Sequence, residues 1–190
     1  MKRKESATLR RVPTPRETVI MVVEGLAFLA QLVLCILFYN YLALSWLCYL
    51  GWALLGVAMV LGWRARVAFE TKGEAPVGEG WLHTTAVVDS GIYGLVRHPM
   101  YLSFMLISLA LVLLSQHWLN ALLGALLVGL IYSDMGREEK SCLAKFGDAY
   151  RDYMERVPRV NLLAGIVRRT RRQNKNEDAP SSHLDGRSLR

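Results

Sequence analysis

Residues 42–63 read LALSWLCYLGWALLGVAMVLGW, a run of 22 residues without a charged side chain. An α-helix rises about 1.5 Å per residue, so this run is long enough to cross a hydrocarbon core about 30 Å thick. Soluble domains interleave their apolar residues with charge every few positions. The stretch therefore predicts a membrane-spanning helix.

Three further apolar runs surround this one. Residues 19–38 form a run of 20 interrupted only by Glu24 and Gln31, and residues 100–114 and 118–132 are uncharged runs of 15. The last two are short for a span, but flanking residues and local thinning of the bilayer accommodate a short helix. We predict an all-α, polytopic membrane protein with two transmembrane helical hairpins, about four spans in all. A cytoplasmic loop joins the hairpins, and a C-terminal amphipathic helix follows them.

The Lys and Arg residues are confined to three segments of the chain. Six lie in residues 1–18, four in residues 64–98 and 13 after residue 133, whereas the short links 39–41 and 115–117 hold none. Under the positive-inside rule, this asymmetry places both termini and the 64–98 connection in the cytoplasm. The two hairpin tips are then on the opposite side.

The net charge of +7 follows from this topology. Basic residues at the cytoplasmic face attract anionic lipid head groups. A basic tail would also fit nucleic-acid binding, but the membrane accounts for the charge, and we expect no nucleic-acid partner. We divide the chain into a basic N-terminus (1–18), a first hairpin (19–63), a region with the second hairpin (64–160) and a basic tail (161–190). The tail is polar and poor in aromatic residues, which predicts disorder from about residue 170.

The cysteines do not indicate a metal centre. Cys35, Cys48 and Cys142 have neither metal-ligand nor disulfide spacing, and two of them lie in predicted spans. We expect packing roles and no metal.

Residues 91–101, GIYGLVRHPMY, precede the third apolar run. Pro99 fits the first turn of a helix, where its missing N–H is not needed. It also favours an extended conformation for His98. The sequence therefore predicts that the third span begins at about Pro99. An extended portion at residues 86–88 and a turn at 89–91 come before it.

Residues 133–159, SDMGREEKSCLAKFGDAYRDYMERVPR, follow the fourth run. Apolar and aromatic residues recur here at helical spacing, which indicates an amphipathic helix that could lie on the membrane surface, with a possible kink at Gly147. Glu138 and Glu139 are about 100° apart on such a helix. Both could face water, or one could turn inward, where a buried acid needs a partner.

These two blocks together resemble the isoprenylcysteine carboxyl methyltransferase and phospholipid methyltransferase superfamily. The resemblance covers roughly residues 80–160. The matching positions are Gly91, Tyr93, Arg97, His98, Pro99, Tyr101, Glu138, Glu139, Leu143, Phe146, Gly147, Tyr150, Tyr153, Val157 and Pro158. Two distant blocks in the right order, separated by an apolar hairpin, make a more specific signal than Arg-His-Pro alone.

The resemblance implies methyl transfer from S-adenosylmethionine to a lipidic or small apolar acceptor. Residues implied as cofactor contacts are Val87, Val88, Tyr93, His98, Pro99, Met100, Tyr101 and Glu138. We assign Glu138 and Arg97 as the catalytic residues. A glutamate can pair with the cofactor ammonium, and an imidazole, an arginine or a helix-start N–H group can meet its carboxylate. Tyrosine faces suit a sulfonium. The protein would act mainly by aligning nucleophile and methyl group.

One position departs from the carboxyl-methylating members. They place a substrate-binding Arg one helical turn before the first glutamate, where this sequence has Asp134. An Asp there disfavours a prenylcysteine carboxylate as substrate and leaves an amine, a thiol or another small nucleophile open. Asp134 could instead be a helix cap. Arg137 could take the place of that Arg, but we expect it to lie on a different face of the helix.

Two other functions compete with methyl transfer. A membrane reductase of related architecture would use NADPH, although the sterol reductases have more spans. A non-catalytic membrane adaptor would keep the scaffold without needing Glu138, His98 and Tyr101. The sequence leaves the oligomeric state and the identity of the membrane open.

Overall fold

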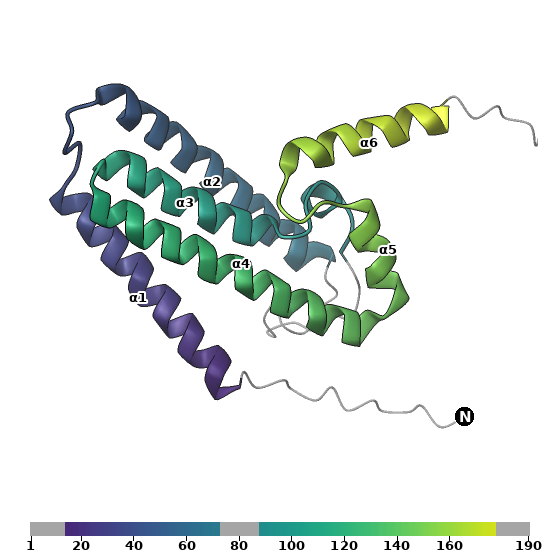
Figure 1. The fold of residues 1–190 in the computed structure, drawn as a ribbon. Coiled ribbons are helices and arrows are strands. Elements are labelled where there is room, and N and C mark those ends of the chain that lie inside the picture. The colour runs from purple at the N-terminus through teal and green to yellow at the C-terminus, as the bar shows by residue number, and fades with distance from the viewer. Residues whose placement is uncertain (1–13, 73–87, 178–190) are drawn as a thin grey trace, which may run out of the picture.

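The apolar runs form helices that pack side by side (Figure 1). The computed structural model describes residues 14–72 and 88–177. Its helices are α1 (Pro15–Leu37), α2 (Ser45–Lys72), the short 3-10 helix η2 (Gly91–Gly94), α3 (Pro99–Ser115), α4 (Trp118–Phe146), α5 (Asp148–Arg156) and α6 (Leu162–Glu177). The described residues contain no strand, and the prediction of an all-α polytopic membrane protein is confirmed.

Three of these helices are long and apolar enough to cross a membrane, over residues 18–37, 45–68 and 118–146. The predicted third span, α3, has 17 residues and falls short of that length. It is also the central helix, because it packs against α1, α2 and α4. Large apolar side chains on α1 and α2 are exposed, including Leu29, Trp46 and Val57, and they form the lipid-facing surface.

Polar side chains join the two hairpin tips. The Gln116 amide donates to the Asn40 side chain (3.0 Å) and to the Leu44 carbonyl (2.9 Å), and it accepts the Leu44 N–H (3.1 Å). The His117 ring stacks on Phe38, with centroids 4.0 Å apart, and its Nδ1 accepts the Leu119 N–H at the start of α4. These contacts fix the two hairpins against each other at this end.

Small residues bring the helices close together within the bundle. A Cβ on Gly51 would lie 2.9 Å from Leu114, and one on Gly124 would lie 2.8 Å from Val112. Close backbone approach of this kind is the usual packing mode of membrane helices. Cys35 and Cys48 lie buried in a cluster with Leu111 and Leu114, as expected for packing residues.

At the opposite end, the chain folds back on the start of α3. His98 is the N-cap of this helix and Pro99 its first residue, which confirms the predicted start. Beyond α5, the Pro158 carbonyl accepts the Arg97 N–H (2.9 Å), and the Arg159 carbonyl accepts the His98 N–H (3.1 Å). The segment after α5 therefore lies directly against the start of α3.

Two predictions about the C-terminal part need correction. The predicted amphipathic helix is broken rather than kinked, because Gly147 (φ 56°) ends α4 and α5 begins at Asp148. Residues 170–177, expected to be disordered, belong to α6, which leaves the bundle as a separate arm (Figure 1). The apolar residues of α6 lie in its first half, at 162–167, and its basic residues follow from 168 onward.

Candidate active site

Three parts of the chain converge at the end of the bundle where α3 begins. They are η2 with the first turn of α3, the last turns of α4, and the segment after α5. The Tyr153 hydroxyl of α5 donates to the Tyr93 carbonyl of η2 at 2.8 Å. Tyr150, Tyr153 and Val157 form a buried cluster, so the aromatic stripe predicted from the sequence packs inside the protein rather than on the membrane.

Glu139 is the centre of a buried ion cluster. Its carboxylate lies 3.2 Å from the Arg97 guanidinium and 3.2 Å from His98 Nε2, and it accepts two hydrogen bonds from Arg159. The residue is only 4% exposed. A buried carboxylate is tolerated when cations and hydrogen bonds satisfy it, and two guanidinium groups do so here. Glu139 thereby ties α4 to the start of α3 and to the segment after α5.

His98 lies in this cluster as a neutral ring. Burial lowers its pKa to about 4, despite the hydrogen bond to Glu139 that acts in the opposite direction. We assign the proton to Nε2, because the Glu139 carboxylate accepts there. The other ring nitrogen, Nδ1, then carries a lone pair and acts as an acceptor.

The Nδ1 lone pair faces a second acceptor, the Glu138 carboxylate. Nδ1 and Glu138 Oε2 are 3.8 Å apart, and Oε2 is buried without a hydrogen-bond partner among the described residues. The side chain as a whole is 36% exposed, so the position is accessible. Two acceptors this close, with no donor between them, fit a ligand that carries N–H donors.

Aromatic side chains flank Glu138. The Tyr101 hydroxyl donates to the carboxylate, and the Tyr101 ring meets the edge of the His98 ring at 5.6 Å between centroids. Tyr93 is buried near the same carboxylate, and burial raises the pKa of its hydroxyl. Both tyrosines therefore stay neutral. The face of a neutral tyrosine ring attracts a cation, so the two rings suit a site that holds one.

Arg97 is the remaining predicted catalytic residue. Its side chain is 10% exposed and pairs with Glu139, while its buried Nε has no hydrogen-bond acceptor among the described residues. A buried guanidinium with a spare donor can bind a carboxylate. The site thus offers acceptors at Glu138 and His98 and a donor at Arg97.

The structure brings together most of the residues singled out in the sequence. Tyr93, Arg97, His98, Tyr101 and Glu138 share one cluster, and Pro99 and Met100 form the first turn beside it. Val88 is half-buried at the edge of the described region, and Val87 lies outside the described residues. The roles of these residues stay predictions.

Asp134 lies one turn before Glu138. Its carboxylate forms an ion pair with Arg137, so the side chains of Asp134 and Arg137 lie on the same side of α4. The expectation that Arg137 lies on a different face from position 134 is therefore wrong. Sequence reasoning also missed Glu139 as the acid of the ion cluster, and it missed Arg159 altogether. The available signals were the second glutamate of the pair and an arginine directly after Val157-Pro158.

The central part of the chain is similar in sequence to known proteins. Residues 46–149 match the model of the family described as phospholipid methyltransferase. A 73-residue stretch is 34% identical to protein-S-isoprenylcysteine O-methyltransferase of Schizosaccharomyces pombe, covering 38% of this chain and 31% of that protein. A 71-residue stretch is 37% identical to the delta(14)-sterol reductase TM7SF2 of Mus musculus, covering 36% of this chain and 17% of that protein.

The chain thus matches less than a third of the length of either relative, and no solved structure matches it. The family match, by contrast, spans more than half of the chain, including α2, α3, α4 and the cluster around Glu138. The chain belongs to the phospholipid methyltransferase family.

Proposed function

We propose that the protein is an integral membrane methyltransferase that takes its methyl group from S-adenosylmethionine. The acceptor is a lipidic or small apolar molecule that reaches the site from the bilayer. The observation that carries the proposal is the pair of unsatisfied acceptors, His98 Nδ1 and Glu138 Oε2, set 3.8 Å apart at the end of the bundle. Family membership supports the same reaction class.

The residues present fit this cofactor. Its ammonium group would lie between Glu138 and His98, and its carboxylate would take the spare donor of Arg97. Bound S-adenosylmethionine supplies a methyl group already activated by a sulfonium. The chain's own residues then have to bind, orient and exclude water, with Glu139 and Arg159 holding Arg97 and His98 in place.

The surroundings of the site favour an acceptor other than a carboxylate. Asp134 occupies the turn before Glu138, with a side chain only 16% exposed. Arg137 on the same side of α4 is engaged by Asp134, so this turn offers no free cation to a carboxylate and leaves an amine or a thiol open. We therefore propose an amine or a thiol as the methyl acceptor in preference to a prenylcysteine carboxylate. One similar protein nevertheless has the name protein-S-isoprenylcysteine O-methyltransferase.

A second candidate, an NADPH-dependent reductase, is favoured by the likeness to the sterol reductase. NADPH brings several phosphate charges and needs free cations. Arg159 is engaged with Glu139, Arg97 is paired with it as well and keeps only its Nε as a spare donor, and the unsatisfied groups Glu138 and His98 are acceptors that disfavour phosphate. The site therefore suits S-adenosylmethionine better.

Calorimetric titration of the detergent-purified protein separates the two candidates. S-adenosylhomocysteine should bind and NADPH should not. Glu138→Gln should weaken S-adenosylhomocysteine binding by about tenfold or more, because a charged hydrogen bond contributes about 1.5–3 kcal/mol. The matched control is Glu155→Gln, an exposed acid on α5. Tight NADPH binding without a response to S-adenosylhomocysteine would reject the methyltransferase proposal.

We also propose that both termini and the site lie in the cytoplasm, since the basic residues gather at that end of the bundle. In sealed vesicles, a cysteine at exposed Asn161 and one at exposed Tyr41 should react from opposite sides with an impermeant maleimide. Labelling of both from the same side would contradict the topology.

A further inference from the structure

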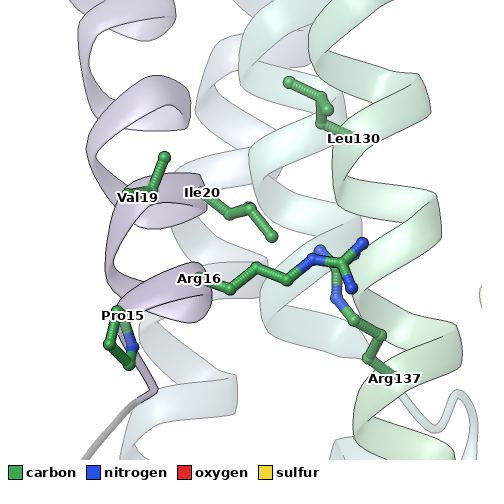
Figure 2. Close-up of a pocket in the computed structure, with 6 residues that line it drawn as sticks. All are labelled: Pro15, Arg16, Val19, Ile20, Leu130 and Arg137. Carbon is green, nitrogen blue, oxygen red and sulfur yellow. The ribbon is translucent and has the colours of Figure 1, made fainter.

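Charged and apolar side chains mark the membrane boundary at the site end of the bundle. Figure 2 shows Arg16 of α1 and Arg137 of α4 reaching toward each other, with apolar side chains further along the two helices. Arg137 directly precedes Glu138, whose carboxylate lies 3.8 Å from His98 at the start of α3. The spans therefore reach the polar surface of the membrane at about the level where α3 begins.

Helix α6 starts at this boundary and leaves the bundle sideways. The N–H groups of Arg97 and His98, directly before α3, donate to the segment that leads into α6. The Asn161 side chain accepts the Ala164 N–H at 2.9 Å and caps the first turn, so the helix has a defined start. Figure 1 shows α6 running across the direction of the spans rather than along it. This start and this direction put α6 in position to lie along the membrane surface.

One side of α6 is fixed against the bundle. A Cβ on Gly165 would overlap the Leu95 carbonyl oxygen, so only a glycine permits this close approach. Arg169, one turn further along the same side of the helix, donates to the Gly91 carbonyl at 3.4 Å. These two contacts hold α6 against η2 and the residue that follows it. They also determine which side of the helix points away from the protein.

The side that points away is apolar. Leu163 is 76% exposed, Val167 49% and Ile166 44%. The three residues lie three and four positions apart, so they form one face of the helix. Gly165 follows Leu163 by two residues, which is about 200° around a helix, so this apolar face is directed away from the contact with Leu95. The described part of the chain leaves the apolar face uncovered.

Exposed arginines follow the apolar face along α6. Arg168 and Arg171 are exposed, and no carboxylate among the described side chains pairs with either. Apolar residues next to arginines are typical of helices that lie in the membrane interface, where anionic head groups attract the basic side chains. A protein partner could also cover the apolar face, but the arginines and the position at the membrane boundary favour the bilayer.

We propose that α6 is an interfacial helix, and that its apolar face inserts into the surface of the membrane at the site end of the bundle. Arg168 and Arg171 then extend to the level of the lipid head groups. Docked in this way, α6 holds the preceding segment against the start of α3, where Arg159 bonds to Glu139. The proposal concerns the membrane surface rather than a bound lipid molecule, and it does not depend on methyl transfer.

Spin labelling of the full chain in vesicles of phosphatidylcholine and phosphatidylglycerol tests the proposal. Leu163→Cys and Val167→Cys would be labelled one at a time after the native cysteines have been replaced by alanine, with Glu155→Cys on exposed α5 as the control position. We expect the labels at 163 and 167 to collide severalfold more with oxygen, which dissolves in lipid, than with a water-soluble nickel chelate. The label at 155 should show the opposite preference.

A substitution within the apolar face gives a second test. Ile166→Asp should move the label at position 163 into water, because a charge on this face opposes insertion. Ile166→Leu is the matched control and should leave the label in lipid. Both variants should fold, since Ile166 is exposed, and an unchanged thermal unfolding temperature in detergent would verify this.

Three results would overturn the proposal. Labels at 163 and 167 that prefer the nickel chelate would show that α6 lies in water. Labels shielded from both probes would show that protein, such as a second copy of the chain, covers the apolar face. An Ile166→Asp variant whose label at 163 stays in lipid would show that insertion does not involve this face.

Discussion

The two ends of the helical bundle use polar side chains in opposite ways. At the hairpin tips, Gln116 bonds to Asn40 and Leu44 through both ends of its amide, and the groups there are neutral. At the site end, the groups are ionisable, and Glu138 and Arg97 keep buried atoms without hydrogen-bond partners. The tips also hold one unpartnered buried oxygen, Asn120 Oδ1, on a neutral amide whose nitrogen donates to the Leu111 carbonyl and to Ser115. The open atoms at the site end belong to ionisable groups, and these indicate a place for a charged ligand.

Within the site end, the adjacent glutamates repeat this contrast. Glu139 is 4% exposed and held by Arg97, His98 and Arg159, whereas the Glu138 side chain is 36% exposed and meets Tyr101. We infer that Glu139 is a positioning residue and that Glu138 contacts the ligand. The substitutions below separate stability from ligand binding, and they are ordered by expected size.

The largest effect should come from Glu139→Ala. Removal of one partner from a buried ion pair typically costs about 3–5 kcal/mol, because the opposite charge is left uncompensated. The free energy of unfolding, measured in detergent with denaturant, should fall by that order, while Glu138→Gln should leave it nearly unchanged in the absence of ligand. Equal losses from both variants would contradict the division of roles.

Acid should also destabilise the protein through His98. Its pKa is about 4 in the fold, below the ordinary value of 6.5, so between these values the unfolded chain binds a proton that the folded chain does not. Stability is therefore greatest above about pH 6.5 and falls as the pH drops toward 4, by at most about 3 kcal/mol. His98→Asn should flatten this part of the pH profile. A wild-type profile with the same slope as the variant would rule out the neutral ring.

At the other end, Gln116→Leu should affect stability alone. It removes the side-chain partner of the part-buried Leu44 N–H and Leu44 carbonyl, and each of these hydrogen bonds contributes about 1 kcal/mol. Calorimetry should show unchanged affinity for S-adenosylhomocysteine in the folded fraction. A weakened affinity would mean that the two ends are coupled.

The smallest effect should come from Tyr153→Phe. This variant keeps the buried ring and loses one hydrogen bond to the Tyr93 carbonyl, for about 1 kcal/mol. Thermal unfolding with the exposed control Glu155→Gln alongside would measure it. A loss of several kcal/mol would show that η2 depends on this bond more than the geometry indicates.

Local sequence patterns predicted the parts of this fold that depend on local physics. Charge-free runs marked the spanning helices, and Pro99 marked the start of α3, because each signal acts within a few residues. The sequence predicted only a kink at Gly147, because a glycine permits either a kink or a helix end. The helix ends there because the chain returns to the start of α3, where the Arg159 carbonyl accepts the His98 N–H.

The candidate site was predictable in its composition but not in its pairing. The motif around His98 and the glutamate pair indicated the right region, and the structure joins them. Which glutamate is buried depends on Arg159, which reaches Glu139 through the segment after α5. That contact is tertiary and has no local signature in the sequence.

The most direct test of the ligand-contacting role of Glu138 is a double-mutant cycle in calorimetry. Wild type and Glu138→Gln would each be titrated with S-adenosylhomocysteine and with its analogue lacking the amino group. We expect the wild type to lose about tenfold in affinity for the analogue and Glu138→Gln to bind both compounds with the same, weaker affinity. A Glu138→Gln variant that discriminates between the two as strongly as the wild type would contradict the assignment.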